Sequence, residues 1–133
     1  MIRRVVATEL FVRDLPRCTT FYRDTLGLKM TESDSESAVF KIGDVYFFLI
    51  ETAAAAHLIS EEPLELKLDG GPRSLLAVEV EDVDATYAAL KSKGVTLLRP
   101  PTDQPWGLRT AHFADPEGNP WEIHRSIGSK QVG

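Results

Sequence analysis

The sequence predicts an α+β protein of two tandem βαβββ modules, whose curved, mostly antiparallel sheets surround a concave pocket. Three observations predict this fold: short alternating apolar runs, one capped helical segment in each half, and the same order of elements in both halves. We expect a single domain over 1–133, with a first module at 5–51, a linker at 52–74 and a second module at 75–126.

The first half begins with the extended run "VVATELFV". Asp14 then occupies a helix N-cap position, Pro16 lies just inside the helix, and Gly27 follows its last apolar residue. Three strand candidates come next, separated by turn residues: "LKMTES", "SAVFKIG" and "VYFFLIE". The segment 52–74 that follows is predicted to be a linker with about one helical turn.

The second half repeats this order. "LLAVEV" is extended, Asp82 or Asp84 can cap the helix "ATYAALKSKG", and Gly94 ends it. The strand candidates are "VTLLRP", "LRTAHFA" and "PWEIHR". "DPEG", between the last two, is predicted to be a hairpin turn that sets the register of the final strand.

Composition excludes several classes of protein. The net charge is −5 and no Lys/Arg stripe is present, so we expect no nucleic-acid partner. No apolar run approaches the roughly 20 residues that span a bilayer, and no signal-peptide cleavage pattern follows the first residues, so no membrane partner is expected. The single cysteine, Cys18, forms no internal disulfide, which is typical of a cytoplasmic protein.

Period-two alternation assigns a face to each strand residue. We expect Thr8, Leu10 and Val12 to face the helix, and Trp121 and Ile123 to face the core. The remaining faces line the predicted pocket. Its lining is Ala7, Glu9, Phe11, Phe47, Leu49, Leu75, Ala77, Glu79 and Glu122, with Trp106, Arg109 and His124 at the margins.

The marginal residues leave alternatives open. Trp106 covers either the ligand or the core, and His124 lies at the pocket rim or on ordinary surface. Arg109 either pairs with Glu122 or Glu79, binds an anionic group, or forms a salt bridge at the rim. His112 is expected on the helix side or at an edge.

Three motifs carry a family resemblance: "LFVRDLPRCTTFYRDTLGL", "DVDATYAALKSKGV" and "WGLRTAHFADPEGNPWEI". They resemble the signatures of the vicinal oxygen chelate superfamily, which holds glyoxalase I, extradiol dioxygenases and bleomycin-resistance proteins. The resemblance implies metal ligands on the first and last strands of each half. Those positions fall at Ala7, Phe47, Leu75 and Glu122, and only Glu122 has a ligand atom for a metal.

The chain is therefore most similar to the metal-free bleomycin-resistance branch, which implies a homodimer, no cofactor, and sequestration of a small molecule such as an antibiotic. Glu9, Glu79 and Glu122 favour a cationic or aromatic ligand. One alternative is a lyase, isomerase or dioxygenase with a divalent metal such as Zn, Ni, Mn or Fe at a displaced site of Glu122, His124 and Glu9. A third is metal-free proton transfer by a carboxylate of raised pKa.

Overall fold

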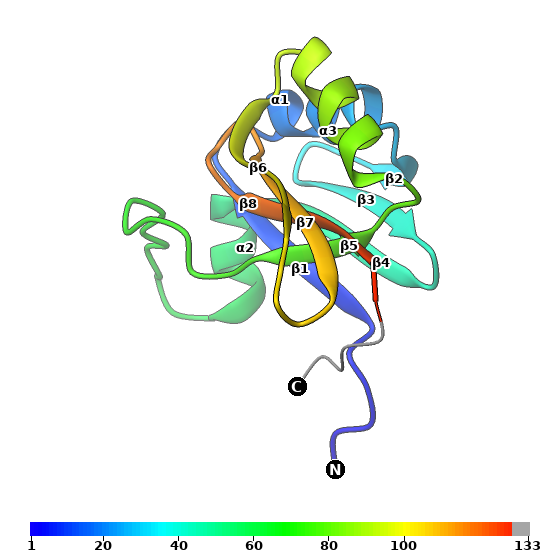
Figure 1. Ribbon diagram of the computed structural model, residues 1–133. Coiled ribbons are helices and arrows are strands. Elements are labelled where there is room, and N and C mark those ends of the chain that lie inside the picture. The colour runs from blue at the N-terminus through cyan, green and yellow to red at the C-terminus, as the bar shows by residue number, and fades with distance from the viewer. Residues whose placement is uncertain (129–133) are drawn as a thin grey trace. The chain divides into compact units, whose positions relative to one another are not determined.

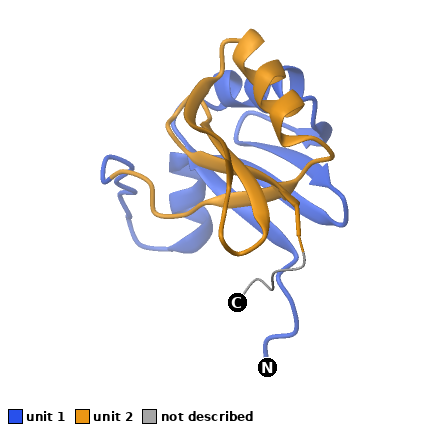
Figure 2. Ribbon diagram, in the orientation of Figure 1, with its two compact units in different colours: residues 1–70 blue, residues 71–133 orange. Residues whose placement is uncertain are grey.

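The computed structural model describes residues 1–128 of the chain, which divides into two compact units. Unit 1 is Met1–Gly70, and unit 2 begins at Gly71 (Figure 2). Each unit contains one four-stranded sheet with helices packed on it.

Unit 1 holds a mixed sheet with strand order β1-β4-β3-β2 (Figure 1). β1 runs parallel to β4, and the other neighbours are antiparallel. The elements are β1 (Ala7–Val12), α1 (Leu15–Thr20), the single π-helical turn η1 (Phe21–Thr25) that continues α1, β2 (Lys29–Ser33), β3 (Ser37–Ile42), β4 (Val45–Glu51) and α2 (Thr52–Ile59).

Unit 2 repeats the topology, with strand order β5-β8-β7-β6 and β5 parallel to β8. Its elements are β5 (Leu76–Glu79), α3 (Val83–Ser92), β6 (Thr96–Asp103), β7 (Leu108–Ala114) and β8 (Pro120–Ser126). The α+β class and the two tandem βαβββ modules are confirmed.

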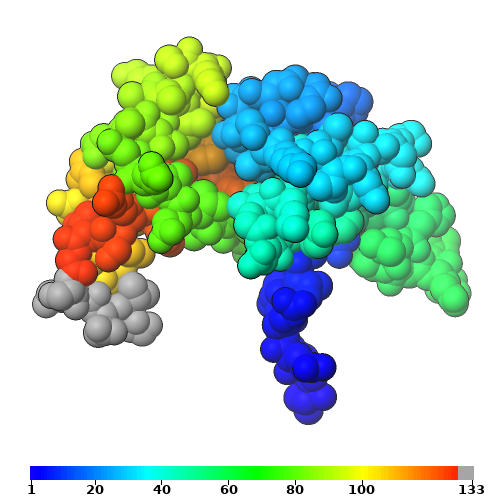
Figure 3. Space-filling view, turned by 90° about the vertical axis from the view of Figure 1, so that its right-hand side faces the viewer, coloured from blue at the N-terminus to red at the C-terminus, as the bar shows by residue number. Residues whose placement is uncertain are grey.

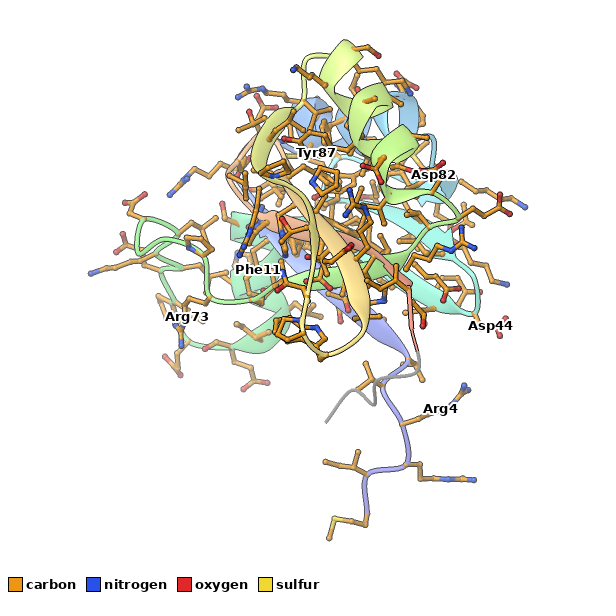
Figure 4. The ribbon with its side chains drawn as sticks, viewed as in Figure 1. Arg4, Phe11, Asp44, Arg73, Asp82 and Tyr87 are labelled. Carbon is orange, nitrogen blue, oxygen red and sulfur yellow. The ribbon has the colours of Figure 1, made fainter. Side chains whose placement is uncertain are left out.

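The predicted helix boundaries follow from backbone capping. The Asp14 carboxylate accepts a hydrogen bond from the Arg17 amide at 3.1 Å, and Asp82, at the start of α3 in Figure 4, accepts one from the Ala85 amide at 2.9 Å. Asp82 is therefore the cap of α3. Gly94 follows that helix with φ of +76°, a conformation that favours glycine.

The segment after β4 is more regular than expected, because α2 has eight residues. Its N-cap is Glu51, whose carboxylate accepts hydrogen bonds from the Ala53 and Ala54 amides at 3.0 and 3.3 Å. These bonds lower the pKa of the Glu51 carboxyl, the Ala53 amide contributing most. The composition "AAAA" explains the helix, since alanine has the highest helix propensity.

The core of unit 1 corrects one of the predicted faces. Phe47 is 2% exposed, and its ring meets that of Tyr22 edge-on at 4.9 Å between centroids. Tyr22 belongs to η1, so Phe47 and Leu49 face the helix and do not line a pocket. The register gives the reason: Thr8 pairs with Phe47, and paired residues share a face of the sheet.

The core of unit 2 agrees with the prediction for β8. Trp121 and Ile123 are buried, and the Trp121 ring stacks on Phe113 at 6.2 Å between centroids. Ala111 pairs with Ile123 and is also buried. This layer lies under α3, which contacts β6, β7 and β8.

The N-terminal segment lies outside the core of unit 1. It extends away from the body of that unit in Figure 3, and both Ile2 and Val5 are exposed. The Val6 carbonyl still accepts a hydrogen bond from the Tyr46 amide at 3.2 Å. This bond holds the first pair of the β1–β4 ladder, Ala7 with Tyr46.

The helices are short. Among residues 1–128 the longest α-helix is α3, with ten residues, and α1 with its continuation η1 is of similar length, whereas about 20 residues are needed to cross a bilayer. No helix in this part of the chain is long and apolar enough to span a membrane.

Replacement of Phe47 by alanine tests the corrected face. We expect Phe47→Ala to lower the free energy of unfolding by about 3–5 kcal/mol, because it opens a cavity beneath Tyr22. The control is Tyr46→Ala on the neighbouring, 42% exposed residue, with an expected loss below about 1 kcal/mol. Urea unfolding measures both, and equal losses would contradict the assignment.

Candidate functional site

The candidate site lies on the sheet of unit 2, on the face turned away from α3, which we call the distal face. On β5, Ala77 pairs with Glu122 and Glu79 pairs with His124. On β7, His112 pairs with Glu122 and Thr110 with His124. Paired strand residues share a face, so the register brings these side chains together. The distal face thus contains Ala77, Glu79, Thr110, His112, Glu122 and His124.

The turn between β7 and β8 fixes this register. The buried Asp115 carboxylate accepts hydrogen bonds from the Glu117 and Asn119 amides, both at 2.9 Å, and from the Asn119 side chain at 2.9 Å. Gly118 has φ of +85°, which favours glycine. The prediction that "DPEG" forms a hairpin turn is confirmed, and Ala114 pairs with Pro120 directly beyond it.

Glu122 joins two imidazoles, and we call these three residues the Glu122 cluster: His112, Glu122 and His124. Glu122 Oε1 lies 3.0 Å from His112 Nε2, and Oε2 lies 2.8 Å from His124 Nδ1. The side chain of His112 is 19% exposed, that of Glu122 is 17% exposed and that of His124 is 25% exposed. An ionised carboxylate only accepts hydrogen bonds, so each facing ring nitrogen donates one. Partial burial strengthens both bonds.

His112 is the member of the cluster that the sequence did not predict, and its expected place on the helix side is wrong. Its two neighbours in β7, Ala111 and Phe113, pair with Ile123 and Trp121 in the buried layer under α3, so His112 points to the distal face between them. The available signal was the apolar character of both neighbours, combined with the hairpin register that sets His112 opposite Glu122.

Arg109 does not reach the distal face, so its predicted pairing with Glu122 or Glu79 is wrong. Its guanidinium binds both oxygens of Asp84 on α3 at 2.8 Å, and a further N–H binds Asp103 at 2.8 Å. These bonds raise the pKa of Arg109 and lower that of Asp84. Arg109 thus forms a salt bridge, as one alternative predicted, but on the helix-side face and not at the rim of the predicted pocket.

The first unit offers an internal comparison for the cluster. Counting back five residues from the caps Asp14 and Asp82 makes Glu9 the equivalent of Ala77. Glu9 pairs with Phe48 as Ala77 pairs with Glu122, so Phe48, and not Phe47, is the equivalent of Glu122. By the same register, the apolar equivalents of His112 and His124 are Val39 and Ile50.

The cluster does not fit a divalent metal. Both oxygens of Glu122 are engaged by imidazoles, and Ala7, Phe48 and Leu75 offer no side-chain donor atom. Within residues 1–128 there is no group of three or more His, Cys, Asp or Glu side chains suited to a metal ion. Tetrahedral or octahedral sites need several donors converging on one point.

The other predicted site residues belong to other elements of the chain. Glu9 and Phe11 are on β1 of unit 1 (Figure 4 labels Phe11), and Leu75 precedes β5. Trp106 is exposed in the β6–β7 turn. Their role in ligand contact stays a prediction. A depression of about 320 Å³ beside α2, between His57 and the segment 61–64, contains no predicted site residue.

The repeated strand order defines a two-module α+β protein with the glyoxalase-like fold. The chain belongs to the Glyoxalase/Bleomycin resistance protein/Dioxygenase superfamily, whose family model matches residues 4–123. The resemblance carried by the sequence motifs is thereby confirmed. This superfamily holds several chemistries on one scaffold, so membership alone does not select a reaction.

Three similar proteins illustrate the relationship. An uncharacterized protein of Bacillus subtilis (strain 168), YraH, is 35% identical over 127 residues, covering 93% of this chain and 99% of its own. A glyoxalase/bleomycin resistance protein/dioxygenase from Nocardioides has a TM-score of 0.83 at 25% identity, and the match covers 100% of this chain and 91% of the Nocardioides chain. A protein of unknown function from Agrobacterium tumefaciens str. C58 has a TM-score of 0.75 at 32% identity, and the match covers 96% of this chain and 97% of the Agrobacterium chain.

The Arg109–Asp84 ion pair predicts a pH dependence of stability. The pKa of Asp84 is lowered in the folded chain. Ionised Asp84 therefore contributes to the free energy of unfolding at pH values above the ordinary aspartate pKa of about 3.9. This contribution is lost as the pH falls through the lowered pKa of the folded chain. We expect Asp84→Asn to lower Tm at neutral pH by no more than a few degrees, because the pair is exposed.

The two melting curves should converge in acid, as circular dichroism can measure. In an Arg109→Gln background, Asp84→Asn removes only the interaction of the carboxylate with the α3 dipole. It should therefore shift Tm less than the same substitution does in the wild-type protein. An unchanged shift in that background would contradict the assigned pair.

Proposed function

We propose that this protein is a metal-independent binding protein for a small cationic or aromatic molecule, such as an antibiotic, and that the distal face of unit 2 is its recognition surface. The Glu122 cluster carries the proposal. Its carboxylate shares the distal face with that of Glu79, which pairs in the sheet with His124. The Arg109 guanidinium, which would attract anions to this face, is held on the opposite face by Asp84 and Asp103.

The charged residues of the distal face support a cationic ligand. Glu79 and Glu122 share the distal face, and the basic residue next to them is Arg99, which pairs with His112 on the bulged strand β6. Two carboxylates against one guanidinium favour a cation. Aromatic contact would come from Trp106, which is exposed at the β6–β7 turn of the same unit.

A ligand screen tests this function. Thermal shift and calorimetry should detect binding of cationic glycopeptide-like or planar antibiotics, with the same affinity after treatment with a chelator. Matched anionic compounds should not bind. Binding of anions alone would overturn the proposal, as would a ligand affinity that disappears on chelation and returns with Zn, Ni, Mn or Fe.

Two matched variants locate the site. We expect Glu122→Gln to weaken the cationic hit by about tenfold or more, because it removes a partly buried charge from the recognition surface. Arg109→Gln is the control, since it changes a charge of the same unit on the helix-side face. It should leave the dissociation constant unchanged in calorimetry; equal losses in both variants would place the ligand elsewhere.

A further inference from the structure

The Glu122 cluster fixes which ring nitrogens carry hydrogen. Glu122 accepts from Nε2 of His112 and from Nδ1 of His124, so each imidazole uses its N–H on the carboxylate. In the neutral rings the opposite nitrogens, His112 Nδ1 and His124 Nε2, then have lone pairs and no hydrogen. Each imidazole of the cluster therefore keeps one ring nitrogen that can only accept a hydrogen bond.

These acceptors lack partners within the part of the chain that the structure describes. His112 Nδ1 is buried and has no hydrogen-bond partner among residues 1–128. A buried polar atom without a partner costs roughly 1–3 kcal/mol, so such atoms are uncommon in folded proteins. His124 is the more exposed imidazole of the two, and its contact with the protein is made through Nδ1.

The cluster thus combines a carboxylate with an imidazole nitrogen that can accept a hydrogen bond. We propose that it selects cations that carry N–H groups, such as protonated primary amines and amidines, over cations without hydrogen-bond donors, with His124 Nε2 as the accepting atom and Glu122 as its positioning residue. This inference rests on the proposed function and narrows its ligand class. A quaternary ammonium has the charge to meet Glu79 and Glu122 but no hydrogen to give to His124.

A matched pair of probes separates charge from hydrogen bonding. Benzylammonium and benzyltrimethylammonium have the same ring and the same charge, and only the first has N–H donors. At about pH 8, where free imidazole is neutral, we expect calorimetry to show benzylammonium binding about tenfold more tightly.

Two variants assign the preference to the ring nitrogen. His124→Asn places an amide N–H near the position of Nδ1, which preserves the donation to Glu122, but it has no acceptor at the position of Nε2. The tenfold preference should disappear in this variant. Glu79→Gln is the control, because it removes a charge beside His124 and leaves the imidazole in place. It should weaken both probes by the same factor and keep their ratio.

The outcomes distinguish the selection of N–H donors from the proposed cation-binding function on which it rests. A tenfold ratio that persists in Glu79→Gln and vanishes in His124→Asn supports donor selection. Equal affinity of the two probes for the wild-type protein overturns the inference and leaves the cation-binding function in place. Failure of both probes to bind overturns both. The wild-type comparison needs no variant, so a poorly folded substitution does not prevent the decision.

Discussion

The pairing of β7 with β8 is the constraint on which the candidate site depends. Asp115 holds the turn between the two strands through three hydrogen bonds, and the register that begins at Ala114 and Pro120 sets His112 opposite Glu122. A slip by one residue would send the Glu122 carboxylate into the layer that holds Trp121. The structural turn and the polar cluster are therefore parts of one arrangement.

The fold could be predicted from the sequence because local signals agree with one another. The caps Asp14 and Asp82, the terminal glycines and the repeated order of elements all point to two equivalent modules. The faces of β1, β5 and β8 also followed from alternation, which correctly placed Glu79, Glu122 and His124 on one face.

The errors have a common physical origin. Alternation divides a strand into two faces but does not say which of them meets the helix. In "VYFFLIE" almost every residue is apolar, so Phe47 and Phe48 could not be told apart without the register to β1. In β7 the long side chain of Arg109 was assigned to the pocket, and this placed His112 on the wrong face. The partner strand supplies the missing information, and it is distant in sequence.

The two units show how one backbone topology carries different chemistry. The positions of His112, Glu122 and His124 in unit 2 correspond to Val39, Phe48 and Ile50 in unit 1. The apolar set needs only packing, whereas the polar set is stable because both carboxylate oxygens of Glu122 accept hydrogen bonds. The polar groups that each module presents thus depend on a few residues at fixed register positions.

Glu122 determines the tautomers of both neighbouring histidines. ¹⁵N NMR of the imidazole rings at about pH 8 tests it directly, because protonated and unprotonated ring nitrogens differ in chemical shift. We predict hydrogen on Nδ1 of His124 and on Nε2 of His112. Hydrogen on Nε2 of His124 would contradict the account, because that nitrogen could then no longer accept a hydrogen bond from a ligand.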